Sequence, residues 1–184
     1  MKLPNYKKNR RRGFTLLETL FAVIILMIAI TVTFSTTQSN LSYSFATRDQ
    51  AIATNLAEEA LEYIRNVRDS NAIAGQNWID DPPSGSPDIA AKLFNCLDKV
   101  CYVDIRQRKI TECSPGGCPP IRAKSNGFYG YNSSSEWSNT RFVRSVTVSK
   151  IANREIAVAV NVAWNSGTIQ RRFTLSEHLF DWKF

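Results

Sequence analysis

Hydrophobic residues dominate the chain from Phe14 to Phe34, a run of 21 residues that contains a single charged side chain, Glu18. About 20 consecutive apolar residues let a helix cross a bilayer, so this run predicts a membrane-spanning helix. Five basic residues come shortly before it: Lys7, Lys8, Arg10, Arg11 and Arg12. Because positively charged flanks stay in the cytoplasm, we expect the N-terminus inside the cell and the rest of the chain outside.

The helical pattern continues past the apolar run. An apolar residue recurs every four or seven positions, as on one face of a helix, at Leu41, Phe45, Ile52, Leu56, Tyr63 and Val67. Neither glycine nor proline occurs between Phe14 and Ser70. We therefore predict one long helix whose second part packs this stripe on its own domain. A coiled coil with a partner is the less favoured alternative, since only about four heptads are present.

Strict alternation marks the C-terminal part of the chain. Ile156, Val158, Val160, Val162 and Trp164 alternate with small or polar residues, and the runs 142–148 and 169–175 alternate in the same way. Turn-forming residues at 152–154 and 165–167 separate the three runs, which predicts an antiparallel meander. We expect the middle run at the centre of the sheet, with both faces covered and the long helix on one of them.

The region between helix and meander is irregular. Glycine, proline, serine and aspartate predict a loop over 70–90, and a short helix is expected over 89–97. Two short strands follow at 100–105 and 109–112, and 114–138 is rich in turns. The sequence thus predicts an α+β fold, with a long N-terminal helix packed on a C-terminal antiparallel sheet.

Four cysteines lie in this irregular region: Cys96, Cys101, Cys113 and Cys118. The topology places them outside the cytoplasm, where disulfides form. A hairpin turning at 106–108 would set the first opposite the fourth and the second opposite the third, and we favour this nested pairing. Local pairing of each cysteine with its sequence neighbour, and a crossed pairing, stay open because spacing alone does not decide connectivity. A zinc site is less favoured, given the spacing and the compartment.

The net charge of +7 belongs mostly to the N-terminus. Residues 1–13 hold six of the 23 basic residues and no acid, so 17 basic and 16 acidic residues remain, a charge of +1. A basic nucleic-acid-binding domain is therefore not indicated. A basic patch for DNA is conceivable near Trp137 and Tyr131, but we favour ordinary solvated strand residues; its members would be Arg141, Arg144, Lys150, Arg154, Arg171 and Arg172.

Catalytic signatures are lacking in the sequence. Its single histidine, His178, stands near no nucleophile motif, and we interpret it as a surface residue. Asp80, Asp81 and Asp88 match no EF-hand spacing and are interpreted as solvated loop acids. We expect no catalytic residue, no cofactor and no metal.

The segment Arg12-Gly13-Phe14-Thr15-Leu16-Leu17-Glu18, followed by an apolar helix, resembles the N-terminus of type IV prepilins and type II secretion pseudopilins. The resemblance implies that prepilin peptidase cleaves after Gly13 on the cytoplasmic face and methylates the new N-terminal residue, Phe14. It also implies that Glu18 pairs with the free amine of a neighbouring subunit. One departure is Ser35, which stands where many major pilins carry a proline.

Two simpler interpretations account for less. A secretory signal peptide would have a shorter apolar core and a small-residue cleavage site after it. A plain signal anchor leaves Glu18 unexplained, because an acid at mid-membrane costs about 2.5–3.5 kcal/mol on insertion scales.

The resemblance implies an organisation of leader peptide (1–13), membrane and assembly helix (14–34), amphipathic helix (35–70) and extracytoplasmic domain (71–184). It implies a structural subunit, closer to a minor pilin or pseudopilin, held in the inner membrane before assembly and in a filament or the envelope afterwards. Expected partners are other pilins or pseudopilins, prepilin peptidase, the inner-membrane assembly platform and the membrane. The alternatives are an anchored binding domain that does not assemble, or a DNA-binding competence pilin.

Overall fold

One long helix, α1 (Leu16–Ile73), forms where the sequence is free of glycine and proline. These two residue types are the least favourable in a helix interior, so their absence allows uninterrupted backbone hydrogen bonding. The predicted long helix is confirmed, and it ends three residues beyond Ser70.

The computed structural model describes residues 13–73, 75, 78, 93 and 95–182. The chain divides into two compact units, Met1–Phe45 and Ala46–Phe184. Most of the loop expected over 70–90, and most of the short helix expected over 89–97, lie outside the described residues.

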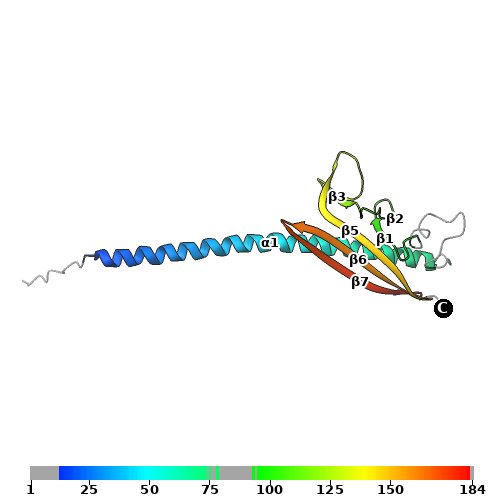
Figure 1. Ribbon diagram of the computed structural model, residues 1–184, viewed down its shortest axis with the longest axis horizontal. Coiled ribbons are helices and arrows are strands. Elements are labelled where there is room, and N and C mark those ends of the chain that lie inside the picture. Colours follow the sequence, from blue (N-terminus) through cyan, green and yellow to red (C-terminus); the bar gives the residue numbers. More distant parts are fainter. Residues whose placement is uncertain (1–12, 74, 76–77, 79–92, 94, 183–184) are drawn as a thin grey trace, which may run out of the picture. The chain divides into compact units, whose positions relative to one another are not determined.

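Seven strands of the second unit form one antiparallel sheet (Figure 1). Strands β5 and β6 pair along most of their length; β6 also pairs with β7, while β1 and β3 pair with the other edge of β5. Strand β2 extends the sheet from β1, and β4 from β3. The strands are β1 (Val100–Asp104), β2 (Lys109–Glu112), β3 (Pro120–Lys124), β4 (Tyr129–Gly130), β5 (Trp137–Ala152), β6 (Glu155–Ser166) and β7 (Ile169–Phe180).

The last three strands form the predicted meander. The β5–β6 turn consists of Asn153 and Arg154, and the β6–β7 turn of Gly167 and Thr168, each within a residue of the predicted positions. Gly167 has a φ of +62°, a left-handed conformation that glycine adopts at little cost. The two hairpins therefore follow from local sequence alone.

The second half of α1 and the inner face of the sheet share one hydrophobic core. Ala53, Ala57 and Ala60 are fully buried on the helix, and these small side chains let its backbone approach the sheet closely. The bulky row of β6 faces this helix and is at most 2% exposed. Figure 1 shows α1 crossing the face of β5, β6 and β7.

Two details of the predicted packing are wrong. The small-residue face of β6 is half-buried rather than covered. On α1, Leu56 and Val67 are buried as predicted, but Leu41 and Phe45 are 55% and 63% exposed. Both belong to the first unit, Met1–Phe45. The apolar stripe therefore begins before the segment of the helix that packs in the core.

The favoured nested disulfide pairing is also wrong: Cys96 bonds Cys101, and Cys113 bonds Cys118. The β1–β2 hairpin is present, but its register sets Cys101 opposite Glu112 rather than opposite Cys113. A shift of one residue turns a side chain to the other face of a strand pair, so Cys101 and Cys113 point to opposite faces. The two disulfides also exclude a zinc site built from the four thiolates.

Candidate processing and assembly site

The residues just before α1 form an N-terminal cap. The carbonyl oxygen of Thr15 accepts hydrogen bonds from the backbone nitrogens of Glu18 and Thr19, at 3.0 and 3.2 Å. The Thr15 hydroxyl oxygen lies 3.4 Å from the same Glu18 nitrogen. A threonine followed three residues later by glutamate is a common sequence at the start of a helix. The cap therefore leaves Gly13 and Phe14 outside the helix.

The peptide bond between Gly13 and Phe14 is open to its surroundings. Both residues are non-helical, and the Phe14 side chain is 75% exposed. A β-carbon built on Gly13 would meet no atom within 4 Å. A protease needs a substrate bond that is accessible and outside a helix, and this bond meets both conditions.

Glu18 occupies the first turn of α1. A carboxylate there is favoured by the partial positive charge of the helix N-terminus. In the part of the chain that the structure describes, its side chain makes no hydrogen bond or ion pair. Glu18 is thus held at a defined place on the helix with its carboxylate available to a partner.

Threonine hydroxyl groups in and just after the apolar run donate hydrogen bonds to backbone carbonyls of the same helix. Thr31 donates to the Met27 carbonyl at 2.8 Å, and Thr36 donates to the Val32 carbonyl at 2.9 Å. Such bonds to the preceding turn remove the cost of burying a hydroxyl away from water. Glu18 is then the one residue between Phe14 and Phe34 that brings a formal charge into the run.

The first part of α1 presents an apolar surface that its own unit does not cover. Every residue from 13 to 45 is exposed, including Phe21, Ile25 and Phe34 at 56%, 66% and 67%. The helix is long and apolar enough to cross a membrane. A surface of this kind is stable only against lipid or other apolar helices.

Fold and site together give a pilin-like arrangement: a long apolar helix preceded by an accessible Gly–Phe bond, packed in its second half on an antiparallel sheet. Residues 8–34 match the family model of the prokaryotic N-terminal methylation motif. Residues 8–34 therefore carry a prepilin-type N-terminal methylation motif. No curated protein and no solved structure matches it.

The basic strand residues do not form one solvated group. Arg144 is 3% exposed and donates to the carbonyl oxygens of Leu56 and Val103, at 2.8 and 2.6 Å. The interpretation of Arg144 as a solvated residue is therefore wrong. The strand pattern contained the signal, since Arg144 is in phase with the buried Phe142.

Two other basic residues considered for the DNA patch pair with carboxylates. Arg141 bonds the buried Asp49 at 2.6 Å, and Arg154 lies 3.6 Å from Asp181. The side chain of His178 is 56% exposed, with its Nδ1 2.6 Å from the Glu155 carboxylate, so it is the surface histidine that was expected. Asp80, Asp81 and Asp88 lie outside the described residues.

Burial also changes the chemistry of a tyrosine beside Arg144. Removal from water raises the pKa of Tyr131, and the nearby Arg144 charge opposes this in part. The Arg144 guanidinium carbon lies 6.0 Å from the centre of the Tyr131 ring. Tyr131 therefore stays protonated over the physiological pH range.

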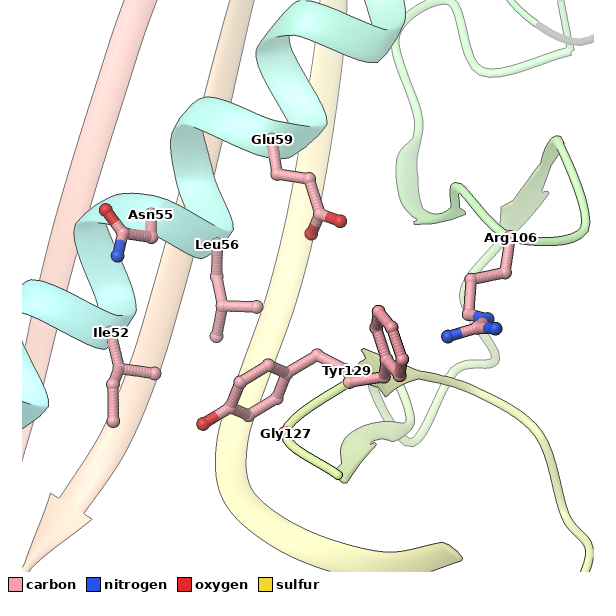
Figure 2. Close-up of a pocket in the computed structure, with 8 residues that line it drawn as sticks. Ile52, Asn55, Leu56, Glu59, Arg106, Gly127 and Tyr129 are labelled. Atoms are coloured by element: carbon pink, nitrogen blue, oxygen red, sulfur yellow. The ribbon is translucent and has the colours of Figure 1, made fainter. Parts of the chain in front are cut away.

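A pocket that the sequence did not predict lies between α1 and the β3–β4 hairpin. We call it the hairpin pocket; it has a volume of about 680 Å³ and its lining residues are Ile52, Asn55, Leu56, Glu59, Arg106, Gly127, Phe128 and Tyr129. Figure 2 shows Glu59 and Arg106 on opposite sides of the open space. Three segments far apart in the sequence form it, so no local pattern could have indicated it.

Proposed function

We propose that the chain is a structural subunit of a type IV pilus or of a related secretion filament, in the role of a minor pilin or pseudopilin. The observation that carries this proposal is the methylation motif over residues 8–34, placed directly before an apolar helix whose residues are exposed from 13 to 45. Such a helix has the surface needed to reside in a membrane and then to pack with other helices.

Processing begins at the Gly13–Phe14 bond. Prepilin peptidase hydrolyses this bond with one water molecule, which leaves a carboxylate on Gly13 and a free amine on Phe14. A sulfonium methyl donor then transfers its methyl group to the neutral form of that amine and leaves as a thioether, and the resulting secondary amine is positively charged at neutral pH. The accessible, non-helical geometry of Gly13 and Phe14 supports this step.

The role of Glu18 is to pair with the Phe14 amine of a neighbouring subunit. A carboxylate and an ammonium are each costly in an apolar environment, and together they are tolerated. Leaving Glu18 unpaired among packed helices would bury an uncompensated charge and so disfavour a wrong register. The unengaged Glu18 carboxylate of the single chain supports this assignment.

We further propose a compartment for each segment. Residues 1–13 are a cytoplasmic leader, residues 14–34 span the inner membrane and pack in the filament, and residues 35–184 lie outside the cytoplasm. The two disulfides support an oxidising location for the second unit. The chain has a structural role and no enzymatic one.

The test uses the full chain expressed in its native host. Mass spectrometry of sheared filaments and of membranes follows the N-terminal peptide of wild type, Glu18→Ala and the control Glu58→Ala. We expect a methylated peptide that begins at Phe14 in the filaments of wild type and control. Glu18→Ala should be absent from filaments but retained in membranes.

Two results would contradict the proposal. If only an uncut Met1 form is found, and only in membranes, the chain is an anchored domain that does not assemble. If Glu18→Ala enters filaments as efficiently as wild type, the proposed ion pair does not direct assembly.

A further inference from the structure

Two asparagines of the chain stand in the pattern Asn-X-Ser, the acceptor pattern for attachment of a sugar to the asparagine amide. The first is Asn40-Leu41-Ser42, within α1, and the second is Asn132-Ser133-Ser134, between β4 and β5. The pattern is short, so sequence alone does not separate a modification site from a coincidence. The two segments differ in structure, and the difference decides which one a sugar transferase can use.

The helical segment is a poor acceptor. Asn40 and Ser42 lie inside α1, where backbone hydrogen bonds fix the conformation of every residue. Side chains two positions apart on a helix do not face each other. The Asn40 amide and the Ser42 hydroxyl therefore lie on different sides of the helix, and one active site cannot hold both without unwinding it.

The loop segment has the opposite properties. Every residue from 132 to 136 is exposed and lies outside helices and strands. The Asn132 side-chain oxygen accepts a hydrogen bond from the Ser134 backbone nitrogen at 2.9 Å, so the two residues of the pattern are close together. In the part of the chain that the structure describes, the Asn132 side-chain nitrogen and the Ser134 hydroxyl make no hydrogen bond. Both groups are therefore available to an enzyme.

The ends of this loop are anchored while its middle projects. Tyr131 is half-buried at its start, and Lys124 of β3 bonds Glu136 at its end, at 2.6 Å. The Arg122 guanidinium donates to the Asn132 carbonyl oxygen at 3.4 Å. Figure 1 shows the segment that leads into β5 as a projection away from α1. The folded unit thus presents Asn132 at a defined place, where an added group would displace no core residue.

We propose that Asn132 is an N-glycosylation site of the folded chain. The sugar donor is an oligosaccharide linked through a diphosphate to a membrane lipid, and the acceptor is the Asn132 side-chain nitrogen. A bond forms between this nitrogen and the first carbon of the sugar, the bond from that carbon to the lipid diphosphate breaks, and one amide proton passes to a base of the transferase. The side-chain oxygen keeps its hydrogen bond to the Ser134 nitrogen, because the reaction changes only the nitrogen.

The inference rests on one part of the proposed function, the placement of residues 35–184 outside the cytoplasm, because Asn-X-Ser acceptors are modified in exported chains. It does not depend on cleavage after Gly13 or on filament assembly. An attached glycan is bulky and hydrated, so it would shield the exposed loop that leads into β5.

Glycopeptide mass spectrometry of the full chain, from filaments and membranes of the native host, tests the site. Trypsin releases residues 125–141 as one peptide, which contains Asn132, and residues 14–48 of the processed chain as another, which contains Asn40. Fragmentation that keeps the glycan on the peptide locates the residue to which it is attached. We expect a glycan on Asn132 and none on Asn40.

The serines beside Asn132 supply matched variants. Ser134→Ala removes the hydroxyl of the pattern but keeps the backbone nitrogen that donates to Asn132, so it should abolish the glycan, whereas Ser134→Thr should retain it. Ser133→Ala changes the middle position, where any residue except proline is accepted, and should leave the glycan as in wild type. A glycan carried by a serine would not follow this order.

Three results would overturn the inference: an unmodified 125–141 peptide in both fractions, a sugar attached to a serine, or a glycan on Asn40. The N-terminus is measured in the same samples. A mature Phe14 terminus in filaments, together with an unmodified Asn132, leaves the proposed function standing. A glycan on Asn132 of a chain that keeps Met1 supports the inference and contradicts the proposed processing.

Discussion

Arg144 is the residue whose replacement tests the account of the fold most directly. It lies on the inner face of β5, 3% exposed, and connects the strand to α1 and β1. Its guanidinium donates to the carbonyl oxygens of Leu56 and Val103 and to the Glu59 carboxylate, the last at 3.1 Å. Arg144→Met removes these three hydrogen bonds while it keeps a long apolar side chain in the space.

The expected loss of stability is about 3 kcal/mol. A hydrogen bond that involves a charged group contributes about 1.5–3 kcal/mol, and two of the three bonds end on buried carbonyls. The bond to Glu59 contributes less, because that carboxylate is 46% exposed and water screens it. Burying a methionine costs less desolvation free energy than burying a guanidinium. This difference lowers the expected loss of stability to about 3 kcal/mol.

Urea unfolding of the full chain in mild detergent, followed by tryptophan fluorescence, measures the effect. Because ΔG falls by about 1–3 kcal/mol per molar urea, the midpoint of Arg144→Met should fall by about 1–3 M. The control Arg171→Met, at an exposed position of β7, should shift ΔG by less than about 0.5 kcal/mol. If Arg144→Met is as stable as wild type, then the buried guanidinium does not hold helix and sheet together.

Three further predictions concern the second unit. Mild reduction followed by alkylation and mass spectrometry should label Cys113 and Cys118 before the other two cysteines, which are at most 1% exposed; simultaneous labelling of all four would contradict this order. The hydrogen bond from Lys124 lowers the pKa of Glu136, so this pair stabilises the fold above the ordinary carboxyl pKa and the contribution is lost as the pH falls through the lowered value. Lys124→Met should return the Glu136 pKa to its ordinary range in an NMR titration, and an unchanged pKa would exclude this cause. Gly130→Ala should change the tryptophan emission spectrum, since an added β-carbon would lie 3.3 Å from a neighbouring indole ring; an unchanged spectrum would show that the ring has room to move.

Local sequence was sufficient for most secondary structure. Helix α1 and the β5–β6–β7 meander were predicted because a period of 3.6 or 2 is a property of one segment. The methylation motif over residues 8–34 could also be recognised from sequence, since its residues belong to one short run. The cap formed by Thr15 could have been predicted in the same way, from its spacing to Glu18.

Features that join distant segments were missed or predicted wrongly. The nested disulfides failed because the β1–β2 register differs by one residue from the register that spacing suggested. Leu41 and Phe45 were expected in the core but are exposed. The apolar stripe on the helix does not reveal which part of the helix the domain covers.

By itself, the sequence determined the membrane-length helix, the methylation motif, the alternating strands and the positions of their turns. Each depends on interactions among residues a few positions apart, which the chain makes wherever the segment lies. The tertiary structure alone decided the burial of Arg144, the disulfide partners and the hairpin pocket. Those features depend on how strands pair in register and on which side chains a folded neighbour shields from water, and no single segment carries that information.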